Sequence, residues 1–402
     1  LARQMVGLLD EYIPIVEGSE INDDPFNPIS RYAKNLMHEK GDDTPISWLH
    51  RNDRFSEKLA TPDVTVADII GDVDPIKAAN LKLTYADDRV IHFGMIPRSN
   101  RCIFVINELP DLQPRIQVAL FNILQEGDVQ IRGFAVRLPL DIQFVFTANP
   151  EDYTNRGSIV TPLKDRIGSQ ILTHYPEDIT TARTITEQET KEAINAKSNV
   201  YVPDLAKDIL EQISFEAREN DFIDAKSGVS ARLSITAFEN LLSTAERRAL
   251  QNGEEETSVR LGDFVGIIPS ITGKIELVYE GEQEGVSQVA QQLITDAVNT
   301  IFKEKFPKIE KLTKDGDPDP YAEVVAWFFE ENDFELLDSY TDEEYKNELD
   351  RIIPLQQLIE KYQPETSKKD GYFLKEVILW ALAENKKLSK FSLGNGLHFR
   401  DL

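Results

Sequence analysis

The chain has 402 residues, of which 41% are hydrophobic and 28% are charged, a composition typical of folded, water-soluble proteins of two or three domains. Its formal net charge is −26, which argues against nucleic acid as a partner because contacts to phosphate supply most of that affinity. No apolar run approaches the roughly twenty residues that span a bilayer, so we expect no membrane association either.

The chain contains one cysteine, Cys102, which excludes an internal disulfide and fits a reducing compartment. The five histidines are scattered and none forms a metal-ligand spacing with that cysteine. We therefore expect a cytoplasmic protein without a cysteine–histidine metal site.

The first hundred residues carry few regular patterns. Residues 1–9 read as the middle of a helix that lacks a cap, and residues 13–17 read as a strand. Residues 41–62 are rich in Gly, Pro, Asp and Thr, so we expect an irregular segment there.

The most informative stretch is residues 101–109, where four apolar residues, 103–106, predict a short strand buried on both faces. Asn107 and Glu108 follow at its carboxyl end, the edge at which open parallel sheets bind ligands. A carboxylate there can polarise a water for attack on a phosphate, or help to hold a magnesium ion. A buried strand that ends in a solvated turn explains this run equally well when it is taken alone.

A helix and a hairpin are expected next. Pro114 suits a first helical position, apolar residues recur at helical spacing to residue 124, and Gly127 can end the helix in the left-handed conformation. Residues 128–132 and 134–138 alternate in polarity around Gly133, which predicts a hairpin.

A second buried strand, residues 141–150, also ends in polar residues, Asn149 among them. Two such strands, separated by a helix and a hairpin, predict a parallel α/β sheet with a site along one edge. After Tyr175 and Pro176 the pattern becomes helical, and the expected helices are 179–196, 204–217, 231–251, 258–268, 287–306, 321–329, 345–362 and 372–384.

Residues 64–176 resemble the AAA+ ATPases, and within them the magnesium chelatase ATPase subunit and its MoxR-like relatives. The resemblance is carried, in order, by residues 68–75, 94–101, the strand before Asn107 and residues 163–168. It implies an α/β fold with a parallel-sheet, P-loop-type AAA+ core (1–176), an α-helical lid (177–269) and an α-helical C-terminal extension (270–402). Residues 81–85 and 89–93 would form the hairpin that this clade inserts into a core helix.

The resemblance also implies roles for individual residues. Asn107 and Glu108 stand where the family has its Walker B acidic pair; Glu108 would orient the attacking water, and both would contact Mg²⁺ weakly. Asn149 matches sensor 1, an amide near the γ-phosphate of ATP. The alternative for Asn149 is a turn residue before Pro150.

Two arginines complete the implied site. Arg166 resembles the arginine finger that reaches the nucleotide of a neighbouring subunit, with Asp165 holding its guanidinium. Arg232, in the segment 228–233, resembles sensor 2 on the lid and would touch the phosphates. The alternatives are a surface ion pair between Asp165 and Arg166, and a solvated arginine at a helix start for Arg232.

The chain departs from the family in three respects, the least important of which is Cys102 in a position where relatives commonly have Gly. It contains no glycine-rich phosphate loop of the G-x-x-x-x-G-K-[ST] type, and its first residues read as the helix that follows such a loop, so we expect Leu1 to lie just after it. Asn107 stands where the family usually has Asp, and an amide coordinates magnesium less strongly than a carboxylate.

The resemblance implies an ATPase that uses ATP and Mg²⁺, assembles as a homo-oligomeric ring and remodels a partner protein, with a separate von Willebrand A domain protein as a candidate partner. The alternative is a degenerate member of the family that does not hydrolyse ATP and acts as a scaffold or binding module. A σ54-type activator is a weaker alternative, because the Gly-Ala-Phe-Thr-Gly-Ala loop of that class is not found in the sequence.

Overall fold

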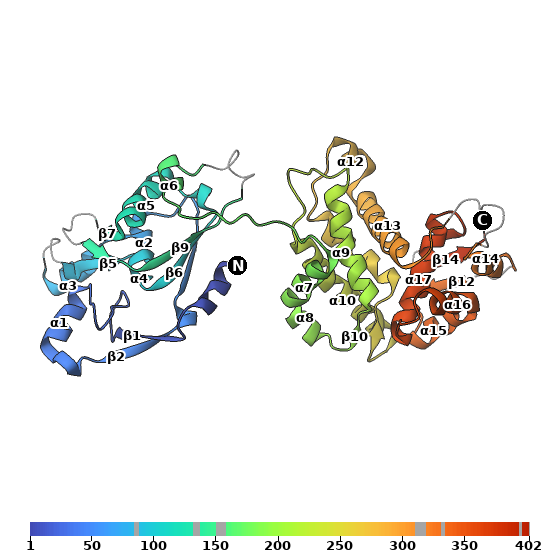
Figure 1. The fold of residues 1–402 in the computed structure, drawn as a ribbon, viewed down its shortest axis with the longest axis horizontal. Coiled ribbons are helices and arrows are strands. Elements are labelled where there is room, and N and C mark those ends of the chain that lie inside the picture. Colours follow the sequence, from blue (N-terminus) through green and yellow to red (C-terminus); the bar gives the residue numbers. More distant parts are fainter. Residues whose placement is uncertain are drawn as a thin grey trace. The chain divides into compact units, whose positions relative to one another are not determined.

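The computed structural model describes residues 1–83, 88–131, 137–149, 158–309, 319–330, 334–393 and 396–401. The chain divides into two compact units, residues 1–172 and residues 173–402 (Figure 1). It is a mixed α/β protein with a parallel sheet of three strands and many helices, which confirms the predicted fold class. The predicted boundaries at residues 176 and 269 remain predictions.

The parallel sheet of the first unit places the predicted site strand in its centre. The order is β3 (Phe55–Leu59), β6 (Cys102–Asn107) and β9 (Ile142–Phe146). Ile106 of β6 lies opposite Lys58 on one side and Phe146 on the other, so all three strands end at the same edge. Both strands predicted from the sequence are therefore present and adjacent, but only β6 is buried; β9 was predicted to be buried and is instead an outer strand of this sheet whose residues are half-buried or exposed.

Alternate side chains of β6 enter two different apolar clusters, because successive residues of a strand point to opposite faces. Phe104 and Ile106 pack with Ile116 of α5 (Pro114–Glu126). Ile103 and Val105 pack with Val6, which belongs to the 3₁₀ helix η1 (Ala2–Leu8). Burial on both faces explains the uninterrupted apolar run in the sequence.

The helix and hairpin between the two site strands also match their predictions. Helix α5 begins at Pro114 and ends before Gly127, whose φ of 68° is left-handed. Strands β7 (Asp128–Gln130) and β8 (Arg137–Pro139) pair antiparallel. Residues 132–136 lie outside the described residues.

Two expectations for the first hundred residues are wrong. The segment predicted to be irregular, 41–62, contains β2 (Ile46–His50) and β3; β2 pairs antiparallel with β1 (Tyr12–Val16) in a separate sheet. Strand β3 is half exposed at the sheet edge and contains two charged residues, so its hydrophobic signal is weak.

The second error concerns the expected hairpin 81–85 and 89–93. Helix α3 (Pro75–Leu81) occupies the start of that segment, and β5 (Ile91–Phe93) pairs instead with β4 (Gly71–Val73). Residues 84–87 lie outside the described part of the chain. The remaining α-helices of this unit are α1 (Arg31–Lys40), α2 (Val66–Ile69), α4 (Met95–Arg98) and α6 (Thr161–Lys164).

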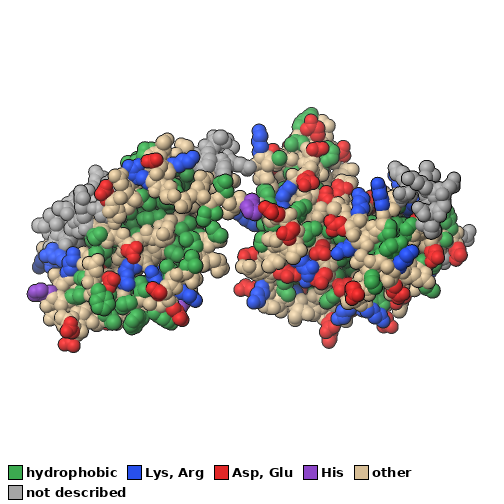
Figure 2. Space-filling model, in the orientation of Figure 1, with side chains coloured by type: hydrophobic (Ala, Val, Ile, Leu, Met, Phe, Trp, Pro, Cys, Tyr) green, Lys and Arg blue, Asp and Glu red, His purple; other side chains and the backbone are tan. Residues whose placement is uncertain are grey.

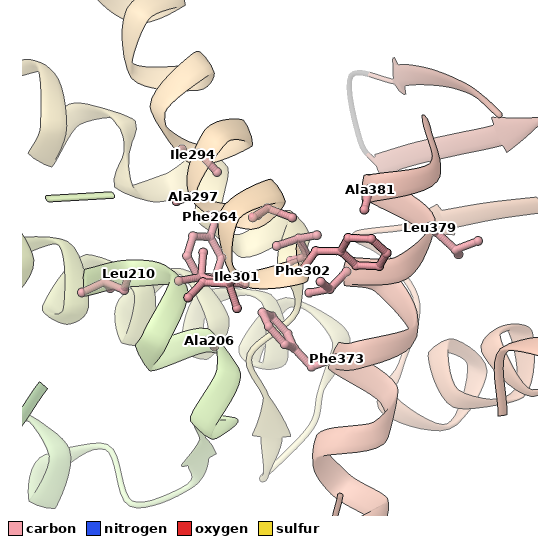
Figure 3. Packing of buried hydrophobic residues seen from close by; sticks show 14 of the residues in the cluster. Ala206, Leu210, Phe264, Ile294, Ala297, Ile301, Phe302, Phe373, Leu379 and Ala381 are labelled. Carbon is pink, nitrogen blue, oxygen red and sulfur yellow. The ribbon is translucent and has the colours of Figure 1, made fainter. Parts of the chain in front are cut away.

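The second unit is mainly helical and is built around one continuous apolar core. Its α-helices are α7 (Ile179–Glu189), α8 (Lys191–Ala196), α9 (Asp204–Glu219), α10 (Arg232–Asn252), α11 (Ile268–Thr272), α12 (Tyr279–Glu284), α13 (Val286–Lys305), α14 (Ala322–Phe329), α15 (Asp342–Arg351), α16 (Ile353–Tyr362) and α17 (Lys368–Glu384). Figure 3 shows side chains of α9, α13 and α17 turned toward one another, with Ile301, Phe302 and Phe373 near the centre. On the face shown in Figure 2, acidic and basic side chains are interspersed over this unit.

Most predicted helices of this unit are present, with several corrections. The helix predicted over 179–196 is two helices, α7 and α8, which meet at Thr190. The helix predicted over 258–268 is a shorter 3₁₀ helix, η7 (Leu261–Ile267). The helix predicted over 345–362 is two helices, because Pro354 belongs to the first turn of a new one. The predicted all-helical C-terminal extension also contains a three-stranded antiparallel sheet of β12 (Phe334–Leu337), β14 (Gly396–Arg400) and β13 (Ser389–Leu393). Two short strands, β10 (Val200–Tyr201) and β11 (Thr257–Ser258), pair in parallel.

Candidate active site at the carboxyl edge of the parallel sheet

A threonine that the sequence analysis overlooked joins the ends of β6 and β9. The Glu108 amide donates to Thr147 Oγ1 at 3.2 Å, and the Thr147 hydroxyl donates to Asn107 Oδ1 at 3.2 Å. The main chain continues the link, because the Leu109 amide donates to the Thr147 carbonyl at 2.9 Å. Three hydrogen bonds thus fix the two strand ends against each other.

Glu108 has an unusual backbone conformation for a residue with a side chain. Its φ of 54° and ψ of 52° are left-handed, a region that costs an L-residue roughly 1–2 kcal/mol. Such strain persists only where the surrounding structure holds it, and it concentrates at functional sites. The bonds from Thr147 and the fully buried Leu109 supply that restraint here.

The Glu108 carboxylate is open to a ligand. Its side chain is half-buried, and it forms no hydrogen bond or ion pair with another described residue. Asn107 differs, because its amide oxygen already accepts the Thr147 hydroxyl. Of the two side chains, Glu108 is therefore the one placed to accept a proton or a hydrogen bond from a water.

Asn149 lies two residues beyond Thr147, on the exposed segment that leaves β9. The segment that carries Asn149 therefore starts at the same edge of the sheet as Glu108. The next residue, Pro150, and residues 151–157 lie outside the described part of the chain.

Arg166 lies against the end of α5. Its guanidinium donates to Gln125 Oε1 at 2.7 Å and to the Pro162 carbonyl at 2.6 Å, and it lies 5.3 Å from the centre of the Phe121 ring. Asp165, its exposed neighbour, forms no ion pair with it within the described structure.

A buried glutamine, also overlooked in the sequence, sets the position of the segment before Arg166. Gln117 of α5 is fully buried; its amide group donates to the Leu112 and Ser158 carbonyls and accepts the Val160 amide at 2.9 Å. A polar residue on the apolar face of a predicted helix is the signal that could have identified it.

Arg232 belongs to the second unit, where it is the first residue of α10. Its side chain is exposed, and its amide donates to Ser230 Oγ at 3.2 Å. Asn107, Glu108, Thr147 and Asn149 all belong to the first unit.

The donor set at the strand ends suits water activation better than metal capture. No group of three or more His, Cys, Asp or Glu side chains could hold a metal ion in the part of the chain that the structure describes. Glu108 offers one free carboxylate. Proteins usually bind Mg²⁺ through one or two carboxylates, while waters and substrate phosphates supply the remaining ligands. No glycine-rich phosphate cradle occurs in the sequence.

None of the described helices has the length and apolarity needed to cross a membrane.

No family model matches the chain, and no curated protein matches it. Similar solved structures include a Cytophaga hutchinsonii protein described as an ATPase, at 19% identity and a TM-score of 0.24, covering 60% of this chain and 76% of that one. The BchI–BchD complex of magnesium chelatase is similar at 17% identity and a TM-score of 0.34, covering 70% and 85%. NtrX from Brucella abortus, in complex with ADP, is similar at 13% identity and a TM-score of 0.36, covering 62% and 52%.

Proposed function

We propose that this chain belongs to an ATPase of the AAA+ type that couples ATP hydrolysis to the remodelling of a partner protein. The observation that carries the proposal is the unpaired Glu108 carboxylate, held in a left-handed conformation where two neighbouring parallel strands end. The ordered motifs that resemble magnesium chelatase ATPase subunits and MoxR-like proteins support it.

The chemistry follows from the position of Glu108. Hydrolysis of ATP requires a water to be oriented in line with the terminal phosphate, and little covalent help. In the proposed role, Glu108 accepts a hydrogen bond or proton from that water, while the Asn149 amide helps to place it. Mg²⁺, when bound with ATP, neutralises charge on the phosphates.

A neighbouring subunit is proposed to complete the site through Arg166. Among the described residues, the Arg166 guanidinium bonds to neutral acceptors, Gln125 and the Pro162 carbonyl, and to no carboxylate. Its charge is therefore not neutralised locally and is available to a phosphate across a ring interface. Arg232 is proposed to act on the phosphates from the helical unit.

Mixing two inactive variants tests this shared site. Glu108→Gln and Arg166→Ala should each hydrolyse ATP poorly, and a mixture should regain turnover, because some interfaces then combine an intact Glu108 with an intact Arg166. If the mixture stays as inactive as its components while the proteins still co-assemble, Arg166 does not act across an interface.

The second candidate function is a scaffold that does not hydrolyse ATP. The scaffold function is favoured by Asn107, which stands where the family has a carboxylate and whose amide oxygen already accepts the Thr147 hydroxyl. A titration of the full-length protein with ATP separates the two: measurable affinity with turnover supports the ATPase, and no affinity at any magnesium concentration supports the scaffold. The cellular partner, proposed to carry a von Willebrand A domain, and a cytoplasmic location are further proposals from the resemblance.

A further inference from the structure

A second polar site lies inside the helical unit, apart from the strand-end site. A cavity of about 130 Å³ lies between α10, the 3₁₀ helix η7 (Leu261–Ile267), α17 and the C-terminal sheet. Its polar lining includes Arg248, Arg260, Asp263, Asp338, Glu376 and Trp380.

Arg248 and Asp263 form a complete buried ion pair. Their side chains are 6% and 5% exposed, and Arg248 Nη2 and Nε donate to the two carboxylate oxygens of Asp263 at 2.9 and 3.0 Å. Arg248 Nη1 donates to Thr257 Oγ1 at 3.1 Å. This pair therefore leaves no charge for the rest of the cavity to balance.

Arg260 is different. It is 5% exposed, and its Nε, Nη1 and Nη2 atoms have no acceptor among the described residues. Its guanidinium lies over the Tyr345 ring, with Cζ 4.3 Å from the ring centre. A guanidinium buried without acceptors is strongly unfavourable, so such groups are normally found paired.

The nearby carboxyl groups do not neutralise Arg260. Glu376 Oε2 accepts the Leu261 amide at 2.7 Å, and neither Glu376 nor Asp338 forms an ion pair with Arg260. Burial raises the pKa of Glu376 to about 7, so this carboxyl carries only part of a full negative charge at neutral pH. The indole Nε1 of Trp380, another buried donor in the lining, also has no acceptor among the described residues.

We propose that this cavity binds a small oxyanion, a ligand with a carboxylate or phosphate group, whose oxygens accept hydrogen bonds from the Arg260 guanidinium and the Trp380 indole N–H. The guanidinium suits such a ligand because its planar fork matches two oxygens at once. The volume far exceeds the roughly 10–15 Å³ that one water needs, and it is below the roughly 300 Å³ of sites for larger ligands. A nucleotide is therefore excluded, and the site is separate from the proposed ATPase centre.

The test is thermal unfolding of the full chain in a phosphate series and an acetate series, with sodium chloride matching the ionic strength. A ligand that binds only the folded state raises the midpoint. We expect a rise with phosphate, with acetate or with both, and the stronger response identifies the ligand class. No rise in either series would overturn the proposal and would mean that water alone hydrates Arg260.

Three variants locate the effect. Arg260→Met should abolish the response, and Trp380→Phe, which keeps an aromatic ring, should weaken anion affinity by about tenfold. Arg247→Met, a matched loss of an exposed arginine on α10, should respond as the wild type does. An equal response in Arg260→Met and the wild type would show an adventitious ion only, and would contradict the proposal; if Arg260→Met does not fold, Trp380→Phe decides.

Discussion

The Glu108 amide donates a hydrogen bond to the Thr147 hydroxyl across the ends of two parallel strands. The same hydroxyl donates to Asn107, so one side chain fixes both Asn107 and Glu108. Thr147 touches no reacting atom in the proposed mechanism and is a positioning residue.

Thr147→Val should therefore destabilise the fold and lower turnover together. It leaves the Glu108 amide and the Asn107 oxygen without their partner, at a cost of roughly 1–3 kcal/mol. Thr147→Ser keeps the hydroxyl and should retain most of both properties. Urea unfolding and steady-state ATP hydrolysis measure the two effects, and equal behaviour of Val and Ser would show that the hydroxyl is unimportant.

The left-handed conformation of Glu108 predicts that glycine is the better-folding replacement. Glycine adopts positive φ without penalty, whereas alanine retains the strain. Glu108→Gly should thus be more stable than Glu108→Ala by about 1 kcal/mol, although both lack the carboxylate. Chemical denaturation of the two variants compares them directly, and greater stability of the alanine variant would exclude strain at this position.

The buried pair of Arg248 and Asp263 should be sensitive to loss of one partner. Arg248→Met leaves the Asp263 carboxylate buried and without its two guanidinium bonds, which should destabilise the chain by roughly 3–5 kcal/mol. Arg247→Met, on the exposed face of the same helix, should change the free energy of unfolding by less than about 0.5 kcal/mol. Similar losses for the two variants would contradict the account.

The free energy of unfolding should depend on pH through the titration of Glu376. Burial raises the pKa of this carboxyl from 4.5 to about 7, so the folded state holds its proton more tightly than the unfolded chain. The resulting stabilisation is complete below pH 4.5 and is lost as the pH rises through 7, with a total of roughly 3 kcal/mol.

Glu376→Gln removes this titration while its side-chain oxygen can still accept the Leu261 amide. The free energy of unfolding, measured between pH 5 and 8, should fall with pH more steeply in the wild type than in the variant. Parallel curves would show that Glu376 is ionised in the folded state throughout this range.

The sequence predicted the centre of the parallel sheet well because there the signals agree. Three features there each favour a single local structure: the apolar run before Asn107, Pro114 at the start of α5 and Gly127 at its end. Strand β3 escaped prediction because an exposed edge strand has no continuous apolar pattern, and its pairing with β6 is set by tertiary structure.

The candidate site was predictable only in part for a related reason. The order of Glu108 and Asn149 along the chain indicated two adjacent strand ends, and the structure places those ends side by side. Thr147 acts through partners far away in the sequence, so no local pattern marks it, whereas Gln117 is marked only by its polarity on the apolar face of α5. The unpaired Arg260 escaped notice for the same reason, since burial and a missing acceptor are properties of the fold.

The most direct test of the proposed ATPase is Glu108→Gln in the full-length protein, which keeps the size of the side chain and removes its charge. ATP affinity and ATP turnover are measured on the same samples, with Glu11→Gln, an exposed residue of the same unit, as the matched control. The account predicts near wild-type ATP affinity with turnover reduced by roughly a hundredfold or more in Glu108→Gln, and no change in Glu11→Gln. Unchanged turnover in Glu108→Gln would contradict it.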